Sequence, residues 1–210
     1  MRQAQREEAQ RRQRARDRRN LIVIVAALAL VGAGIFLVAV VLNHQAQVTE
    51  SHRLKFVAQT GEAGQAVPDE GRNHIDPSTT AQYQHYPPAS GPHFAVAGVA
   101  PADWQTVGDL PEGVYIHNLE HGGIAILYSC PSGQACDTLK NQLTDYVKNL
   151  APKEPRYNEV KLVMTPYQRG MEHKIALVAW DRIEWLDSYD QNAITRFYEL
   201  YVDKGPEDIP

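Results

Sequence analysis

The feature that most constrains this chain is an uninterrupted apolar run near its N-terminus. Residues 21–42 are 22 consecutive positions without a charged or strongly polar side chain. A helix needs about 20 such residues to cross the hydrocarbon core of a bilayer. We therefore expect residues 21–42 to form a single transmembrane helix and the rest of the chain to fold separately in water.

The charges before this run predict its orientation. Residues 1–20 carry eight arginines and only three acidic residues. Positive flanks remain in the cytoplasm, so residues 1–20 are predicted to be a basic cytoplasmic tail and the chain after the helix to be extracytoplasmic. A cleaved signal peptide is the alternative, but its apolar region usually spans about 7–15 residues. We therefore expect an uncleaved, single-pass protein of the cell membrane.

The remaining chain is acidic. Residues 43–210 contain 13 lysines and arginines against 22 aspartates and glutamates. Such a domain repels phosphate backbones, so nucleic acid is not an expected partner. Its length suits one ordinary domain with a core. We expect a stalk over residues 43–70 and the extracytoplasmic domain over residues 71–210.

The domain reads as two parts. Residues 71–113 are dense in glycine and proline but include four aromatic side chains, which predicts a long, ordered loop region. Short β-branched and aromatic runs then predict strands at 114–116, 124–128, 160–164 and 175–180. Helical spacing predicts helices at 137–150 and 192–202. The order predicts an α+β fold, a small two-layer α/β sandwich with the helices on one sheet face.

Two cysteines, Cys130 and Cys136, lie close together in the predicted exported domain. In that setting a close, even pair predicts a disulfide, which here would lock a turn. A redox-active pair is the alternative interpretation. Five residues separate the cysteines rather than two, which argues for the structural bond.

The segments that most strongly suggest a functional site are HNLEHGG at residues 117–123 and YPPASGPH at residues 86–93. In a strand, His117 and His121 would be about 13 Å apart, too far to share an ion. On a helical turn, residues four apart have Cβ atoms about 5–6 Å apart. Because the glycines that follow can end a turn, we expect both imidazoles on one turn between two strands.

A third imidazole, His93, follows the stiff proline-containing run and completes a predicted metal site with His117 and His121. Glu120 is expected to orient a ring as a neighbouring carboxylate. Neutral imidazole suits copper and zinc, and a thioether would favour Cu(I). We therefore expect a copper or zinc ion. The candidates for a fourth ligand are Glu120, Met171, His173, His74, His85 and water.

Two other functions remain open. In the first, no ion binds: the histidines bond to free main-chain groups and the two motifs dock an envelope protein. In the second, the H-x-x-E-H string of residues 117–121 acts as in inverted zinc peptidases. That motif needs a long helix, whereas glycines and a β-branched run follow here. No G-x-S-x-G or phosphate-binding loop is present, so an enzyme is the less favoured interpretation.

Together, the motifs at residues 86–93 and 117–123 resemble the bacterial family known as domain of unknown function 3105. Its members are similar in plan, with a basic N-terminus, one membrane helix and an exported domain. The resemblance covers roughly residues 55–202, and Ala179-Trp180 fits it too. It implies an exported domain but no activity, so metal binding is inferred from the residues alone.

Overall fold

The structure is a computed structural model that describes residues 2–209, with side chains described from residue 13 onward except at positions 15, 17, 22 and 26. It divides into two compact units, with the boundary between Ser51 and His52. The first unit is a helix, and the second holds the sheet and the remaining helices.

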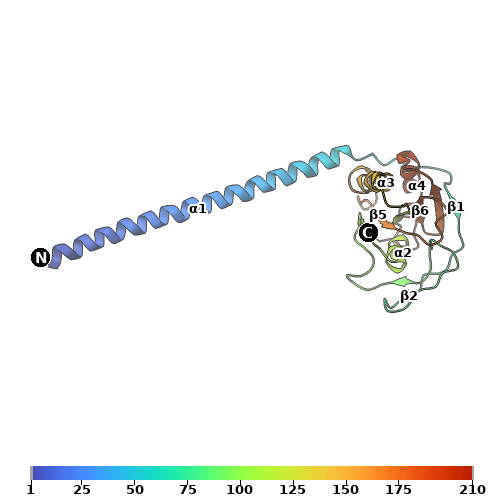
Figure 1. Ribbon diagram of the computed structural model, residues 1–210, viewed down its shortest axis with the longest axis horizontal. Helices are drawn as coiled ribbons and strands as arrows, with labels where there is room; N and C mark the ends of the chain where they lie inside the picture. Colours follow the sequence, from blue (N-terminus) through green and yellow to red (C-terminus); the bar gives the residue numbers. More distant parts are fainter. Residues whose placement is uncertain (1, 210) are drawn as a thin grey trace. The chain divides into compact units, whose positions relative to one another are not determined.

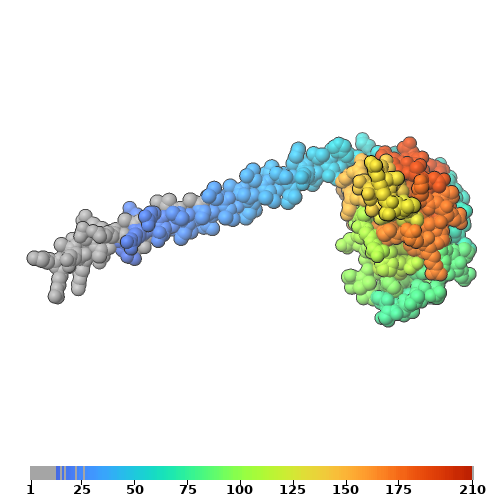
Figure 2. All heavy atoms as spheres, viewed as in Figure 1, coloured from blue at the N-terminus to red at the C-terminus, as the bar shows by residue number. Residues whose placement is uncertain are grey.

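The first unit lies in helix α1 (Arg2–His52). Its segment Arg18–His52 is the one helix among the described residues that is long and apolar enough to cross a membrane. The apolar side chains described along it are exposed, and on the face seen in Figure 2 no other part of the chain covers the coloured length of the helix. Leaving so much apolar surface in water would be costly. The expected apolar helix is confirmed as a candidate membrane anchor.

The second unit is built on a five-stranded sheet with the order β1-β7-β6-β4-β5. Strand β4 is parallel to β5 and antiparallel to β6, while β7 is antiparallel to both β6 and β1. The strands are β1 (Gln65–Ala66), β4 (Ile124–Tyr128), β5 (Leu162–Pro166), β6 (Ile175–Ala179) and β7 (Arg182–Leu186). A separate parallel pair joins β2 (His74–Ile75) and β3 (His93–Phe94).

Helices cover both faces of the sheet (Figure 1). On one face lie α3 (Gln134–Asp145), a π-helical turn η1 (Tyr146–Leu150) and α4 (Gln191–Tyr201). The opposite face carries α2 (Glu112–Glu120) together with the loop region. The α+β class is confirmed. The two predicted helices do lie on one sheet face, but the expected two-layer arrangement is corrected, because the unpredicted helix α2 adds a third layer on the other face.

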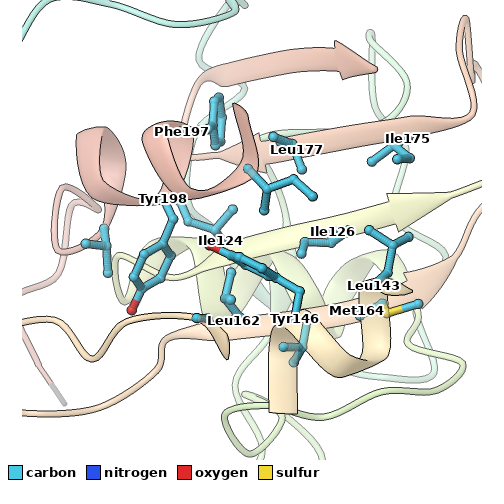
Figure 3. Packing of buried hydrophobic residues seen from close by; sticks show 14 of the residues in the cluster. Ile124, Ile126, Leu143, Tyr146, Leu162, Met164, Ile175, Leu177, Phe197 and Tyr198 are labelled. Atoms are coloured by element: carbon cyan, nitrogen blue, oxygen red, sulfur yellow. The ribbon is translucent and has the colours of Figure 1, made fainter. Parts of the chain in front are cut away.

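The larger core lies between the sheet and α3, η1 and α4. Alternate strand residues point into it, as the period of two along a strand requires. Figure 3 shows how they pack against the aromatic side chains of the helices. The labelled members are Ile124, Ile126, Leu143, Tyr146, Leu162, Met164, Ile175, Leu177, Phe197 and Tyr198.

The smaller core lies under α2. Three α2 side chains, Tyr115, Ile116 and Leu119, are fully buried against the other face of the sheet. The strand predicted at 114–116 is therefore wrong, because these residues belong to a helix. Local β preference is weak, and burial of this short segment, in which every residue from Gly113 to Glu120 is buried, overrides it. Pro111 directly before the helix and Glu112 in its first turn both favour a helix start.

The segment predicted as a stalk, residues 43–70, divides at the unit boundary. Up to His52 it continues α1. Beyond it the chain packs on the folded unit: the Leu54 amide donates to the Leu150 carbonyl at 2.8 Å, and Gln65–Ala66 forms the edge strand β1. Strand β1 pairs with β7, a strand that the sequence patterns did not predict.

Candidate metal centre

The short β2–β3 pair brings the first two histidines together. In its parallel register His74 lies opposite His93, and their ring centroids are 4.8 Å apart. Hydrogen bonds from the loop region fix this arrangement: the Tyr83 hydroxyl donates to the Pro92 carbonyl at 2.8 Å, and the Ser90 hydroxyl oxygen accepts from the Glu70 amide at 3.0 Å. His93 is consequently fully buried.

Helix α2 supplies the next two side chains. His117 and Glu120 are three residues apart, so they lie on one helix face. The helix packs very closely on β3, since a Cβ at Gly113 would lie 2.8 Å from the Phe94 ring. A side chain at position 113 would push the Phe94 ring aside, so glycine allows α2 to lie close against β3 and His93. The His93 and His117 ring centroids are 5.1 Å apart.

The other residues of the 117–123 motif hold the helix in place. The Asn118 side chain donates to the Ala102 carbonyl at 2.8 Å and accepts from the Ala102 amide at 3.0 Å. Leu119 is buried in the smaller core. Gly122 has a φ of +75°, which favours glycine, and it ends the turn against the main chain of Asp203.

The Glu120 carboxylate lies at the centre of the cluster. Its Oε2 is 2.8 Å from His93 Nε2 and 3.3 Å from His74 Nε2. Glu120 is 1% exposed. One candidate metal-binding group combines His74, His117 and Glu120, with all three ligand atoms within 4.8 Å of one another. His93 adjoins this group through the same carboxylate oxygen. We call His74, His93, His117 and Glu120 the central cluster.

The main chain determines which ring nitrogen is free. His93 Nδ1 is 2.9 Å from the Gly91 carbonyl oxygen, and His117 Nδ1 is 2.5 Å from the Phe94 carbonyl oxygen. A carbonyl can only accept, so each Nδ1 must donate. Metal-binding histidines usually donate their second nitrogen in this way, which fixes the tautomer and aims the other nitrogen. In both rings Nε2 is the nitrogen left to bind.

A second candidate group lies at the end of α2 and shares Glu120. It consists of Glu120, His121 and Glu207, whose ligand atoms also lie within 4.8 Å of one another. His121 Nε2 is 3.5 Å from Glu207 Oε2, and the His121 ring centroid is 4.5 Å from that of His117. His121 therefore lies beside the central cluster and faces a carboxylate from the C-terminal segment.

Residues 203–209 run across the end of α2 and position Glu207. The Glu207 amide donates to the Glu120 carbonyl at 3.0 Å, and the Asp203 amide donates to the Gly122 carbonyl at 2.9 Å. Buried Lys161 ties the same segment down, because its amine donates to the Ile209 carbonyl at 2.7 Å and lies 2.8 Å from Asp203 Oδ1.

Burial keeps two of the imidazoles neutral. Desolvation lowers the pKa of His117 and outweighs the hydrogen bond to the Phe94 carbonyl, which raises it; the neighbouring His93 also lowers it. Desolvation also lowers the pKa of His121 to about 4, with His117 adding to the effect. Near neutral pH both rings are therefore in the uncharged form that binds metal ions.

The remaining candidate ligands have other surroundings. His85 Nδ1 is 3.0 Å from Glu70 Oε1, and His173 Nδ1 is 2.9 Å from Asp187 Oδ1. His173 also lies against the Trp185 ring. Met171 is half-buried against the smaller core. Among the described residues, the structure therefore brings His74 to the Glu120 carboxylate, whereas His85 pairs with Glu70, His173 pairs with Asp187 and Met171 packs on the smaller core.

Cys130 and Cys136 form the expected disulfide, between the end of β4 and the first turn of α3. A hollow of about 560 Å³ lies beside this bond. Its lining contains no histidine of either candidate group. The disulfide is thus separate from the centre around Glu120.

Sequence reasoning missed Glu207 altogether. It lies 87 positions after Glu120 in an irregular segment, and no local pattern marks it. His74 was only one of several candidates, because a two-residue strand has no periodicity to reveal its partner. Both residues reach the site through long-range pairing.

Fold and site together define a class of protein: an α+β domain preceded by a candidate membrane anchor and containing a largely buried histidine–carboxylate cluster whose outermost member, His74, is exposed. The pattern of the family described as "Protein of unknown function (DUF3105)" matches residues 74–209, and the chain belongs to that family. The match confirms the resemblance seen in the two motifs. Comparison with curated proteins and with solved structures gave no match.

Proposed function

We propose that this protein binds a transition-metal ion, copper or zinc, outside the cytoplasmic membrane and serves in metal handling or sensing. The ion would be held by Nε2 of His74, His93 and His117 and by the Glu120 carboxylate. Three nitrogens and one oxygen make a ligand set that suits Zn²⁺ or Cu²⁺.

One observation carries the proposal. His93 Nε2 and Glu120 Oε2 face each other at 2.8 Å, while the other nitrogen of His93 already donates to a carbonyl. A buried nitrogen lone pair and a carboxylate repel each other unless a cation or a proton lies between them. His74 approaches the same oxygen from a second direction. A metal ion would satisfy all of these groups at once.

The proposed location follows from the ends of the chain. α1 supplies one candidate membrane helix, and the arginine-rich first 20 residues favour a cytoplasmic N-terminus. The disulfide accords with an oxidising compartment for the domain. We therefore propose a single-pass protein of the cell membrane whose domain receives metal ions outside the cytoplasm.

A metal-free module is the alternative, and one observation favours it. His93 and His117 each donate a hydrogen bond from Nδ1 to a main-chain carbonyl. If His93 is protonated, its ion pair with Glu120 could have the purely structural role of holding β3 against α2. In that case the surface of the loop region would dock an envelope protein. A zinc hydrolase is less favoured, because the Glu120 carboxylate is buried and already faces two rings.

The test compares two matched substitutions in the full chain, purified in detergent. His74 and His85 are 49% and 45% exposed, lie in the same loop region and each contact a glutamate. Only His74 contacts Glu120. We expect His74→Gln to weaken Zn²⁺ binding about 10-fold or more and His85→Gln to leave it unchanged. Equal affinity of all three proteins, or an unsubstituted chain that binds neither zinc nor copper, would refute the proposal.

A further inference from the structure

We propose that the site holds two divalent ions, with Glu120 as the bridging carboxylate. The second ion would bind to Glu120, His121 and Glu207. This inference rests on the proposed function, since it adds a second position to the same centre. It assigns a role to Glu207 and to the C-terminal segment that carries it.

The two candidate groups provide the first argument. Each brings three ligand atoms within 4.8 Å of one another, and Glu120 is the member common to both. A carboxylate has two oxygens, so one side chain can bind an ion on each side. Two-metal sites in proteins hold their ions about 3.5–4 Å apart. His117 belongs to one group and His121 to the other, and their ring centroids are 4.5 Å apart. The two groups are therefore close enough for a pair of neighbouring ions.

Charge provides the second argument. Glu120 and Glu207 bring two carboxylates to His121, and no arginine or lysine forms an ion pair with either among the described residues. The nearby Lys161 amine is paired with Asp203 at 2.8 Å. Two carboxylates and an imidazole without a dedicated cation form a ligand set for a divalent ion.

The main chain provides the third argument. The C-terminal segment is tied to the end of α2 by the Glu207 amide, which donates to the Glu120 carbonyl at 3.0 Å. A Cβ at Gly205 would lie 2.3 Å from that same carbonyl oxygen, so the segment passes the end of α2 too closely for a side chain at this position. This close approach holds Glu207 beside His121.

The experiment counts Zn²⁺ per chain by metal analysis of the full chain in detergent after removal of loose ions. It compares the unsubstituted protein with Glu207→Gln and Asp208→Asn. Glu207 is 38% exposed, so its substitution does not threaten folding. Asp208 is the matched control, because it lies on the same segment but contacts Arg156 and Tyr157. We expect two ions per chain in the unsubstituted protein and in Asp208→Asn, and one ion per chain in Glu207→Gln.

Loading with Cu²⁺ gives an independent readout. We expect the first equivalent to give an isolated Cu²⁺ electron paramagnetic resonance spectrum and the second to add spin coupling between neighbouring ions, which Glu207→Gln abolishes. One ion per unsubstituted chain would overturn the second position but leave the proposed function standing. No ion would refute both. Two ions in Glu207→Gln would overturn the assignment to Glu207.

Discussion

At the scale of single residues, the centre depends on where protons sit. Carbonyl oxygens of Gly91 and Phe94 force Nδ1 of His93 and His117 to donate. The uncharged state of His117 and His121 follows from burial, which lowers both pKa values. The folded domain thus keeps imidazoles neutral in a place where an unfolded chain would protonate them at mildly acidic pH.

This difference predicts a pH-dependent stability of the metal-free protein. The pKa of His121 is about 4 when folded and 6.5 in its ordinary state. Between these values the unfolded chain binds the additional proton, so stability falls as the pH falls from 6.5 towards 4. We expect the melting temperature, measured with a chelator present, to fall less steeply over this window in His121→Gln. Parallel curves for both proteins would contradict the burial argument.

The residue scale also shows what could be predicted from the sequence. His93, His117, Glu120 and His121 could be singled out from their motifs, because a proline-rich run ends in a histidine and two further histidines follow at helical spacing around a glutamate. Glu120 was expected to orient a ring, whereas in the structure its oxygen lies between two imidazoles. A sequence pattern gives the spacing of side chains along one helix but not the direction of approach of a second segment.

At the scale of elements, helix α2 is the element that brings His117 and Glu120 of the sequence motif together with the other histidines of the site. Its residues Val114, Tyr115 and Ile116 individually prefer strands, yet they form a helix because they bury against the sheet. The strands and helices with clear apolar periodicity, such as β4, β6 and α4, could be predicted from the sequence. The two-residue strands β1, β2 and β3 could not, since they are too short to show any period.

The close contact between α2 and β3 predicts that a larger side chain at position 113 lowers the stability of the domain. A Cβ at Gly113 would lie 2.8 Å from the Phe94 ring, so Gly113→Ala must displace either the ring or the helix. We expect a loss of about 1–3 kcal/mol in the free energy of unfolding, measured by urea denaturation, together with weaker metal binding.

Gly108→Ala is the matched control for this substitution. Nothing lies within 4 Å of a Cβ at Gly108, and its backbone does not require glycine. We expect its stability to equal or slightly exceed that of the unsubstituted protein. If Gly113→Ala is no less stable than Gly108→Ala, α2 and β3 do not pack as closely as described.

At the scale of the whole molecule, an acidic domain follows a basic tail and an apolar helix. Their orientation can be tested with a reporter that folds only in an oxidising compartment. We expect alkaline phosphatase fused after the C-terminus to be active in intact cells and the same enzyme fused before the N-terminus to be inactive. The reverse pattern would place the domain in the cytoplasm and remove the proposed extracytoplasmic role.

The family match covers residues 74–209, which contain every ligand of both proposed ions. X-ray absorption at the zinc edge of the Zn²⁺-loaded full chain tests the central claim most directly. We predict nitrogen and oxygen neighbours at about 2.0–2.1 Å, with outer-sphere scattering from imidazole rings. A sulfur neighbour at about 2.3 Å, or a spectrum without imidazole scattering, would contradict a centre built on His74, His93, His117 and Glu120.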